Sequence, residues 1–213
     1  MRLEIKNIEI DKTQVIKFLG YANKKLPPII ERKIDEEIET VGELLRPEAF
    51  LKPFKITQVK DGVTYLEKGC HLESNYLAEQ SMNASSLYFI VYTIGDAIEE
   101  KINTYSSSSE MIRAMILDKI GVVALDYIKG EIKKVIKEQV APNKICIQLF
   151  PGTKDFEISN QKKILDVFQE ENTTINISKH YQLSPIKTVA AVFGIGQVED
   201  QKSMCDQCDN KCY

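Results

Sequence analysis

The feature that most constrains the fold is a long amphipathic segment between residues 112 and 136. Its apolar side chains recur at three- and four-residue spacing, which predicts a single long helix. Gly121 and Gly130 lower helix propensity, so we expect close packing at both positions. Lysines between residues 129 and 137 predict the solvated face of the helix. The apolar positions are Ile112, Met115, Ile116, Ile120, Val123, Tyr127, Ile128, Ile132, Val135 and Ile136.

A second strong signal is the apolar run from Leu87 to Ile94. It is rich in aromatic and β-branched residues and ends at Gly95, which predicts a buried central strand. Two other strand-like segments flank Lys60-Asp61-Gly62, and the Asp-Gly pair tolerates the positive φ of a hairpin turn. The predicted strands cover residues 3–10, 54–59, 63–66, 87–94, 145–149, 175–177 and 189–195.

Helix signals are mixed with these strands. Asp11 suits the N-cap of a short helix that stops at Gly20. Pro27-Pro28 suits the first turn of a second helix, which we expect Pro47 to end. Strands joined by hairpins and mixed with helices favour an α+β fold over a doubly wound sheet. Further short helices are expected at residues 74–81, 97–103 and 159–169.

Composition limits the class of protein. The chain has 213 residues, 43% hydrophobic and 28% charged, which fits one globular domain. We expect that domain over residues 1–200, with residues 1–50 as a helical annex and residues 201–213 as a cysteine-containing tail. A net charge of −3 provides no basic field, so nucleic acid is not expected as a partner. There is no apolar leader and no span-length apolar stretch, so we expect a cytoplasmic protein with no membrane partner.

Three cysteines gather near the C-terminus. Cys205, Cys208 and Cys212 lie within eight residues, and thiolates at such spacing can converge on one zinc ion or an Fe–S cluster. The alternative is a tail whose cysteines hold no metal, and both interpretations stay open. A fourth ligand would come from a partner, from a substrate, or from Cys70, Cys146, His71 or His180.

Two segments suit small-molecule binding. A predicted strand runs into Pro151-Gly152, where glycine lets backbone groups approach a ligand closely, although such turns also occur without ligands. Lys187 would anchor the start of the last strand. Gly194-x-Gly196 lacks the third glycine and the helix of a dinucleotide-binding loop. No hydrolase, zinc-protease or phosphate-loop motif is present, so hydrolysis is not supported.

Taken in order, these features resemble the activation (reactivation) domain of vitamin B12-dependent methionine synthase, in a short stand-alone form. The resemblance extends over nearly the whole chain. It implies a curved, mostly antiparallel sheet with flanking helices, in agreement with the α+β prediction. The matching segments are Ile10-Asp11-Lys12-Thr13, Phe18-Leu19-Gly20-Tyr21, Tyr92-Thr93-Ile94-Gly95-Asp96, Pro151-Gly152-x-x-Asp155-Phe156, Pro185-x-Lys187-Thr188-Val189, Gly194-Ile195-Gly196 and Cys205-x-x-Cys208.

The family resemblance also implies a function. Such a domain binds S-adenosylmethionine and presents its methyl group to a cobalamin, while flavodoxin or another donor supplies an electron. This chain would then be an accessory activation module, with no catalytic residue of its own. Its partner would be a cobalamin-dependent methionine synthase or a corrinoid methyltransferase, and that partner would carry the cobalamin.

The resemblance assigns ligand-binding residues, with two departures. The family motif Arg-x-x-x-Gly-Tyr corresponds here to Gln148, Gly152 and Thr153. A neutral amide in place of the guanidinium loses the charge-assisted bond to a ligand carboxylate, which contributes about 1.5 to 3 kcal/mol. The second family carboxylate falls nearest Val122, with only Asp118 and Asp126 close to it in sequence. The implied ligand residues are Asp11, Gln148, Phe150, Pro151, Gly152, Thr153 and Lys187.

Two other functions remain open from the sequence. One is a non-enzymatic docking or electron-relay protein whose cysteine tail carries zinc or an Fe–S cluster. The other is a site for a different small molecule on the same fold, because a fold does not determine a function.

Overall fold

The structure, a computed structural model, describes residues 1–198. Its centre is a seven-stranded antiparallel sheet in the order β4-β3-β2-β5-β9-β6, and β1 pairs with the beginning of β2. A separate two-stranded sheet pairs β7 with β8. The strands are β1 Arg2–Leu3, β2 Glu48–Lys60, β3 Val63–Leu66, β4 His71–Glu73, β5 Ala84–Thr93, β6 Lys144–Leu149, β7 Asn176–Ile177, β8 Leu183–Ser184 and β9 Thr188–Gly196.

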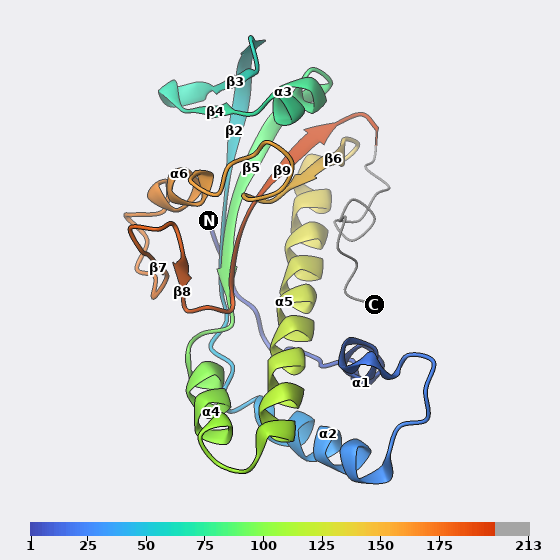
Figure 1. The fold of residues 1–213 in the computed structure, drawn as a ribbon. Coiled ribbons are helices and arrows are strands. Elements are labelled where there is room, and N and C mark those ends of the chain that lie inside the picture. The colour runs from blue at the N-terminus through green and yellow to red at the C-terminus, as the bar shows by residue number, and fades with distance from the viewer. Residues whose placement is uncertain (199–213) are drawn as a thin grey trace.

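Helices cover the two faces of the sheet unequally. The long helix α5 runs along one face, and α6 lies on the opposite side together with the β7–β8 hairpin (Figure 1). No described helix is both long and apolar enough to cross a membrane. The helices are α1 Lys12–Ile16, the π-helical turn η1 Lys17–Tyr21, α2 Pro28–Val41, the 3-10 turn η2 Glu67–Gly69, α3 Asn75–Ser81, α4 Ala97–Ser106, α5 Met111–Val140 and α6 Asn160–Asp166.

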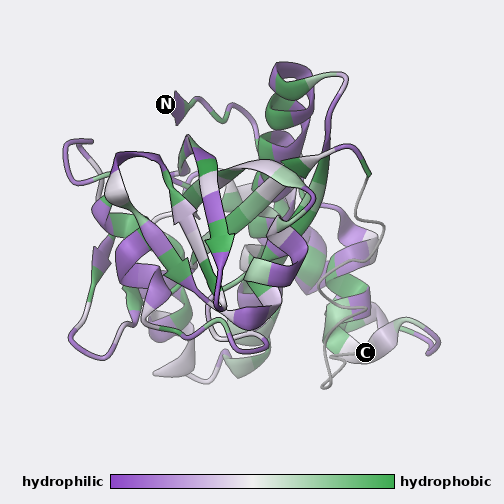
Figure 2. Ribbon diagram, turned by 90° about the horizontal axis from the view of Figure 1, so that it is seen from above, coloured by the Kyte–Doolittle hydropathy of each residue, from purple (hydrophilic) through white to green (hydrophobic). Residues whose placement is uncertain are grey.

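The sheet separates two hydrophobic cores. Side chains alternate along β5, so Ile90 packs toward α5 while Phe89 packs toward α6. Figure 2 shows hydrophobic residues along the central strands and hydrophilic ones on the outer loops. We name the two sides of the sheet the α5 face and the α6 face, and this division determines which predicted site residues can meet.

Most predicted elements are present. The long helix, the central strand, the hairpin and the last strand are confirmed, and Asp11 caps α1 by accepting bonds from the amides of Thr13 and Gln14. The strand predicted over residues 3–10 is wrong beyond Leu3. Its alternating isoleucines are partly buried against the core on the α5 face, so they alternate without a partner strand.

Two further predictions need correction. Helix α2 ends at Val41, with Gly42 as its C-cap, several residues before Pro47. Close packing is confirmed at Gly121, where an added Cβ would lie 3.2 Å from Cε of Lys187 and 3.4 Å from Cδ1 of Ile94. It is wrong for Gly130, because no described atom beyond its chain neighbours and the backbone of its own helix lies within 4 Å of the Cβ position there.

The two glycines of α5 therefore predict opposite effects of substitution. Gly130→Ala gains helix propensity in open space, so we expect the free energy of unfolding to rise by about 0.5 to 1 kcal/mol. Gly121→Leu overpacks the contact with Lys187 and Ile94, so we expect the free energy of unfolding to fall by about 1 to 3 kcal/mol. Urea denaturation of both variants measures this difference, and equal effects would contradict the packing assigned to Gly121.

Candidate functional site

The Pro151-Gly152 turn follows β6 and closes on itself. Gly152 has a φ of +90°, which favours glycine whether or not a ligand is bound. Its amide donates to the carbonyl of Phe156 at 2.7 Å, and the amide and hydroxyl of Thr153 both donate to the carbonyl of Phe150, at 3.1 and 2.6 Å. The two amides are thus engaged inside the turn, so the turn serves mainly to shape the site.

Asp155 fastens this turn to the rest of the protein. Its carboxylate accepts the hydroxyl of Ser74 at 2.6 Å and the amide of Asn75 at 2.6 Å, and the amide of Tyr76 also points at it. The Ser74 hydrogen bond, supported by these amides at the start of α3, lowers the pKa of Asp155 below its ordinary value. The aspartate of the Pro-Gly-x-x-Asp-Phe motif is therefore a positioning residue.

The turn stands at the end of an open sheet edge. The last β6 pair joins Leu149 to Val192, whereas β9 begins at Thr188. Residues 188–191 pair with β5 on one side, and within residues 1–198 no strand pairs with them on the other. Thr188 and Val189 are half-buried at this edge, whereas Ala190 and Ala191 are buried.

Three of the predicted site residues lie on the α5 face. Gln148 is half-buried and pairs with Phe193, whose side chain packs toward α5. Phe150 belongs to the same core. Asp11 is exposed at the start of α1, and Val15 of that helix is buried in this core too.

Lys187 anchors the start of β9 to two helices. Its Nζ donates to Oδ1 of Asp118 on α5 at 2.5 Å, and its backbone amide donates to Oε1 of Glu99 on α4 at 2.8 Å. Burial alone would raise the pKa of Asp118, but the hydrogen bonds from Lys187 and Lys119 outweigh it and leave that pKa lowered. Lys187 thus holds the open edge in place through Asp118.

The other acid named from the sequence is also engaged. Asp126 pairs with Nζ of Lys129 at 2.5 Å. Burial, with the nearby Asp126 carboxylate, raises the pKa of Tyr92, which stays a neutral phenol in the core. Asp118 and Asp126 are therefore both already paired with lysine side chains and are not unpaired acceptors for a ligand ammonium group.

A cavity that opens on the α6 face corresponds to no sequence motif. It has a volume of about 330 Å³ and is formed by the residues before and within α6, the β7–β8 hairpin and the start of β9, including Thr188. Cδ1 of Ile158, a lining residue, lies 3.3 Å from the Cβ position of Gly152, so the cavity adjoins the turn. The other lining residues are Gln161, His180, Tyr181, Gln182, Leu183 and Ile186.

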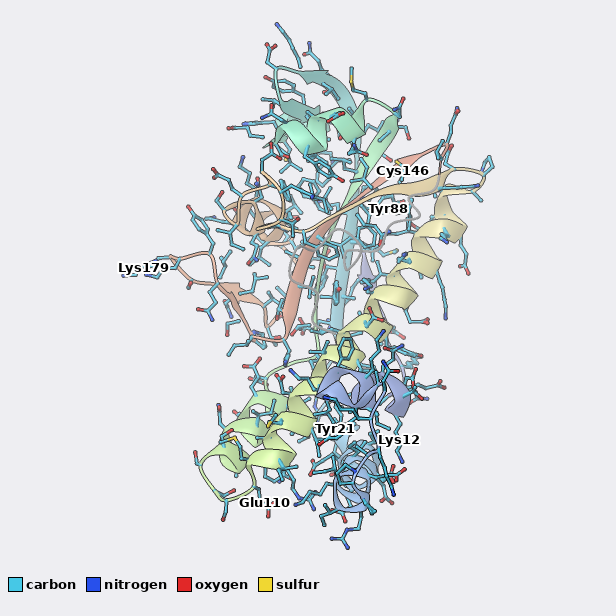
Figure 3. The ribbon with its side chains drawn as sticks, turned by 45° about the vertical axis from the view of Figure 1, so that its right-hand side comes forward. Lys12, Tyr21, Tyr88, Glu110, Cys146 and Lys179 are labelled. Atoms are coloured by element: carbon cyan, nitrogen blue, oxygen red, sulfur yellow. The ribbon has the colours of Figure 1, made fainter. Side chains whose placement is uncertain are left out.

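The cavity and the Asp11 region lie on opposite sides of the sheet. Figure 3 shows Lys12, which follows Asp11, on the side of α5, and Lys179, which precedes His180, on the far side. The structure therefore groups Asp11, Gln148 and Phe150 on one face and the cavity on the other.

Comparison with known proteins supports this fold. Neither protein-family models nor curated proteins give a match. Among solved structures, the crystal structure of the MetH reactivation domain bound to AdoHcy superposes with a TM-score of 0.70. The match covers 91% of this chain and 76% of that chain at 10% sequence identity. This chain has the reactivation-domain fold. The predicted α+β architecture is confirmed.

The structure does not test the prediction of a metal site in the cysteine tail. Cys205, Cys208 and Cys212 lie outside the described residues, so their zinc or Fe–S site stays a prediction. Within residues 1–198 no group of three or more His, Cys, Asp or Glu side chains is placed to hold a metal ion. Cys70 is partly buried, and burial raises the pKa of its thiol.

The anchoring role of Asp155 predicts a pH-dependent loss of stability. Asp155→Asn keeps only one acceptor, so we expect the free energy of unfolding at neutral pH to fall by about 1 kcal/mol. Because the folded pKa is lowered, the carboxylate stabilises above its unfolded pKa and loses this effect as the pH falls through the folded value. The difference between wild type and variant should therefore shrink below about pH 4.

Urea denaturation across this pH range measures the effect. Asp61→Asn is the matched control, because Asp61 is an exposed carboxylate in the β2–β3 turn and asparagine tolerates its positive φ. A loss for Asp155→Asn that is independent of pH would show that the charge of Asp155 has no part in holding the turn.

Proposed function

We propose that this chain is an activation module that binds S-adenosylmethionine and supports reductive methylation of a cobalamin carried by a partner protein. The partner is a cobalamin-dependent methionine synthase or a corrinoid methyltransferase, and flavodoxin or another donor provides the electron. The observation that carries the proposal is the fold shared with the AdoHcy-bound reactivation domain, with the Pro151-Gly152 turn beside an open sheet edge.

The residues present fit an adenosyl amino acid in part. The exposed carboxylate of Asp11 suits a ligand ammonium group, and the amide of Gln148 can donate one hydrogen bond to a ligand carboxylate. Both lie on the α5 face. The edge of β9 beyond the end of β6 is buried at Ala190 and Ala191, so we place the ligand on the α5 face beside the Pro151-Gly152 turn.

Other residues stabilise the conformation of this site. Asp155 fixes the turn to α3, and the Lys187–Asp118 pair fixes the start of β9 to α5. Gly152 allows the positive φ that places Ile158 against the turn. In the proposed reaction S-adenosylmethionine supplies the methyl group, and the chain's own task is to bind it and orient it toward the partner.

The neutral Gln148 predicts a gain of affinity on substitution. In Gln148→Arg a guanidinium can form a charge-assisted, bidentate pair with the ligand carboxylate, so we expect S-adenosylmethionine and S-adenosylhomocysteine to bind about tenfold more tightly. Isothermal titration calorimetry measures both ligands. Gln58→Arg adds the same charge at an exposed position on β2 and should leave the affinity unchanged.

The same titrations can contradict the proposal. If neither wild type nor Gln148→Arg releases heat with either ligand at millimolar concentration, the chain does not bind an adenosyl amino acid. If Gln148→Arg and Gln58→Arg raise the affinity by the same factor, the effect comes from net charge, and Gln148 does not contact the ligand.

A further inference from the structure

The cavity between α6 and the β7–β8 hairpin contains a buried hydrogen-bond acceptor without a donor. Oε1 of Gln161, a lining residue, is buried and has no partner among residues 1–198. An unsatisfied buried acceptor is unfavourable, and native proteins leave few of them without a reason. The volume of about 330 Å³ is large enough for a ring-sized molecule whose donor meets this oxygen.

A second polar group of the lining also accepts hydrogen bonds without donating them. Thr188 is half-buried, and its hydroxyl donates to Oγ1 of Thr93 at 2.9 Å. The Thr93 hydroxyl itself donates to the carbonyl of Lys187 at 3.0 Å, so it returns no proton to Thr188. The oxygen of Thr188 therefore keeps lone pairs but no free proton. The half-buried part of the lining favours a ligand that carries a donor.

An aromatic residue in a strained conformation forms another part of the lining. Tyr181 has a φ of +62°, which is uncommon for a bulky side chain, and it remains 37% exposed. Ser178 holds it there: its carbonyl accepts the Tyr181 amide at 3.0 Å, and its hydroxyl accepts the amides of His180 and Gln182 at 3.3 and 3.1 Å. Backbone strain of this kind is typical of ligand sites, and the tyrosine ring offers an aromatic face to a flat ligand.

The rest of the lining is apolar or exposed to water. Ile158 is 44% exposed, Ile186 is 67% exposed and Leu183 is buried. His180 and Gln182 are polar but exposed, so water can satisfy their side chains. None of the described lining residues is Asp, Glu, Lys or Arg, so a charged ligand would lose its hydration without gaining a counter-charge. The cavity therefore favours a neutral ligand.

We infer that this cavity is a second binding site, separate from that for S-adenosylmethionine, and that it takes an indole ring. Indole is neutral, flat and apolar, and its N–H group donates without accepting. The ring packs against Tyr181, and its N–H donates to Oε1 of Gln161. The chain has no tryptophan of its own, so the ring belongs to a free indole compound or to a tryptophan side chain of a partner protein.

This site goes beyond the proposed function and does not depend on it. The cavity opens on the α6 face, whereas Asp11 and Gln148 lie on the α5 face. Between them Ala190 and Ala191 are buried in the sheet. Occupation of the two sites is therefore expected to be independent.

The experiment compares indole with 1-methylindole, which keeps the ring but has no N–H group. Because the chain has no tryptophan, the fluorescence of either compound reports its binding to the full chain directly. Indole should bind about tenfold more tightly, the effect of one hydrogen bond. Gln161→Leu should abolish this preference without lowering the thermal midpoint, because it removes an unsatisfied acceptor. Gln169→Leu, at an exposed glutamine after α6, should keep the preference.

Tyr181→Gly tests the ring contact separately from the hydrogen bond. Glycine adopts the positive φ without strain, so the variant should keep its fold. Both compounds should bind about fivefold more weakly, because the contact between two aromatic rings is lost. The preference for indole over 1-methylindole should stay, because Gln161 is unchanged.

N-acetyltryptophanamide distinguishes the two sources of the ring. Binding as tight as that of indole would assign the cavity to a tryptophan side chain of a partner protein, and binding of indole alone would assign it to a small molecule. Both results support the site.

Three results would overturn the inference: no binding of indole at millimolar concentration, equal binding of indole and 1-methylindole, or displacement of indole by S-adenosylhomocysteine. The last would show that the cavity belongs to the S-adenosylmethionine site. Indole binding by a chain that does not bind S-adenosylhomocysteine would support this inference and contradict the proposed function alone.

Discussion

The early end of β6 is the constraint on which the candidate site depends. Since β6 stops at Leu149 opposite Val192, the first residues of β9 keep an unpaired edge, and the Pro151-Gly152 turn closes the end of that edge. At that edge Ala190 and Ala191 are buried and Thr188 and Val189 are half-buried, so the exposed carboxylate of Asp11 and the cavity beside Ile158 stay on separate sides of the sheet.

Polar contacts at both ends of the edge hold this arrangement. Asp155 bonds the turn to α3, and Lys187 bonds the start of β9 to α5 through Asp118. Gly121 has no side chain and so leaves room for the side chain of Lys187. These contacts give a physical role to motif residues that a ligand need not touch. At Thr153 the amide and the hydroxyl are both engaged by the carbonyl of Phe150, so this position also shapes the turn.

Much of the fold could be predicted from local pattern. The apolar run from Leu87 to Ile94 and the helix after residue 111 follow from periodicity alone. The segment after Leu3 has the alternation of a strand but packs against a core without pairing, because pairing depends on a free edge elsewhere in the chain. The cavity could not be predicted, since Gln161 and Tyr181 belong to no motif and meet only through tertiary packing.

The central claim is that an adenosyl ligand binds on the α5 face beside the Pro151-Gly152 turn. Backbone amide shifts of the full chain, recorded by NMR during titration with S-adenosylhomocysteine, test it most directly. The account predicts saturable shifts at Asp11, Gln148 and Gly152, with Ser108 in the α4–α5 loop, at the other end of α5 (Figure 1), unchanged. Shifts that leave Gln148 and Gly152 unaffected, or no shifts at millimolar ligand, would contradict it.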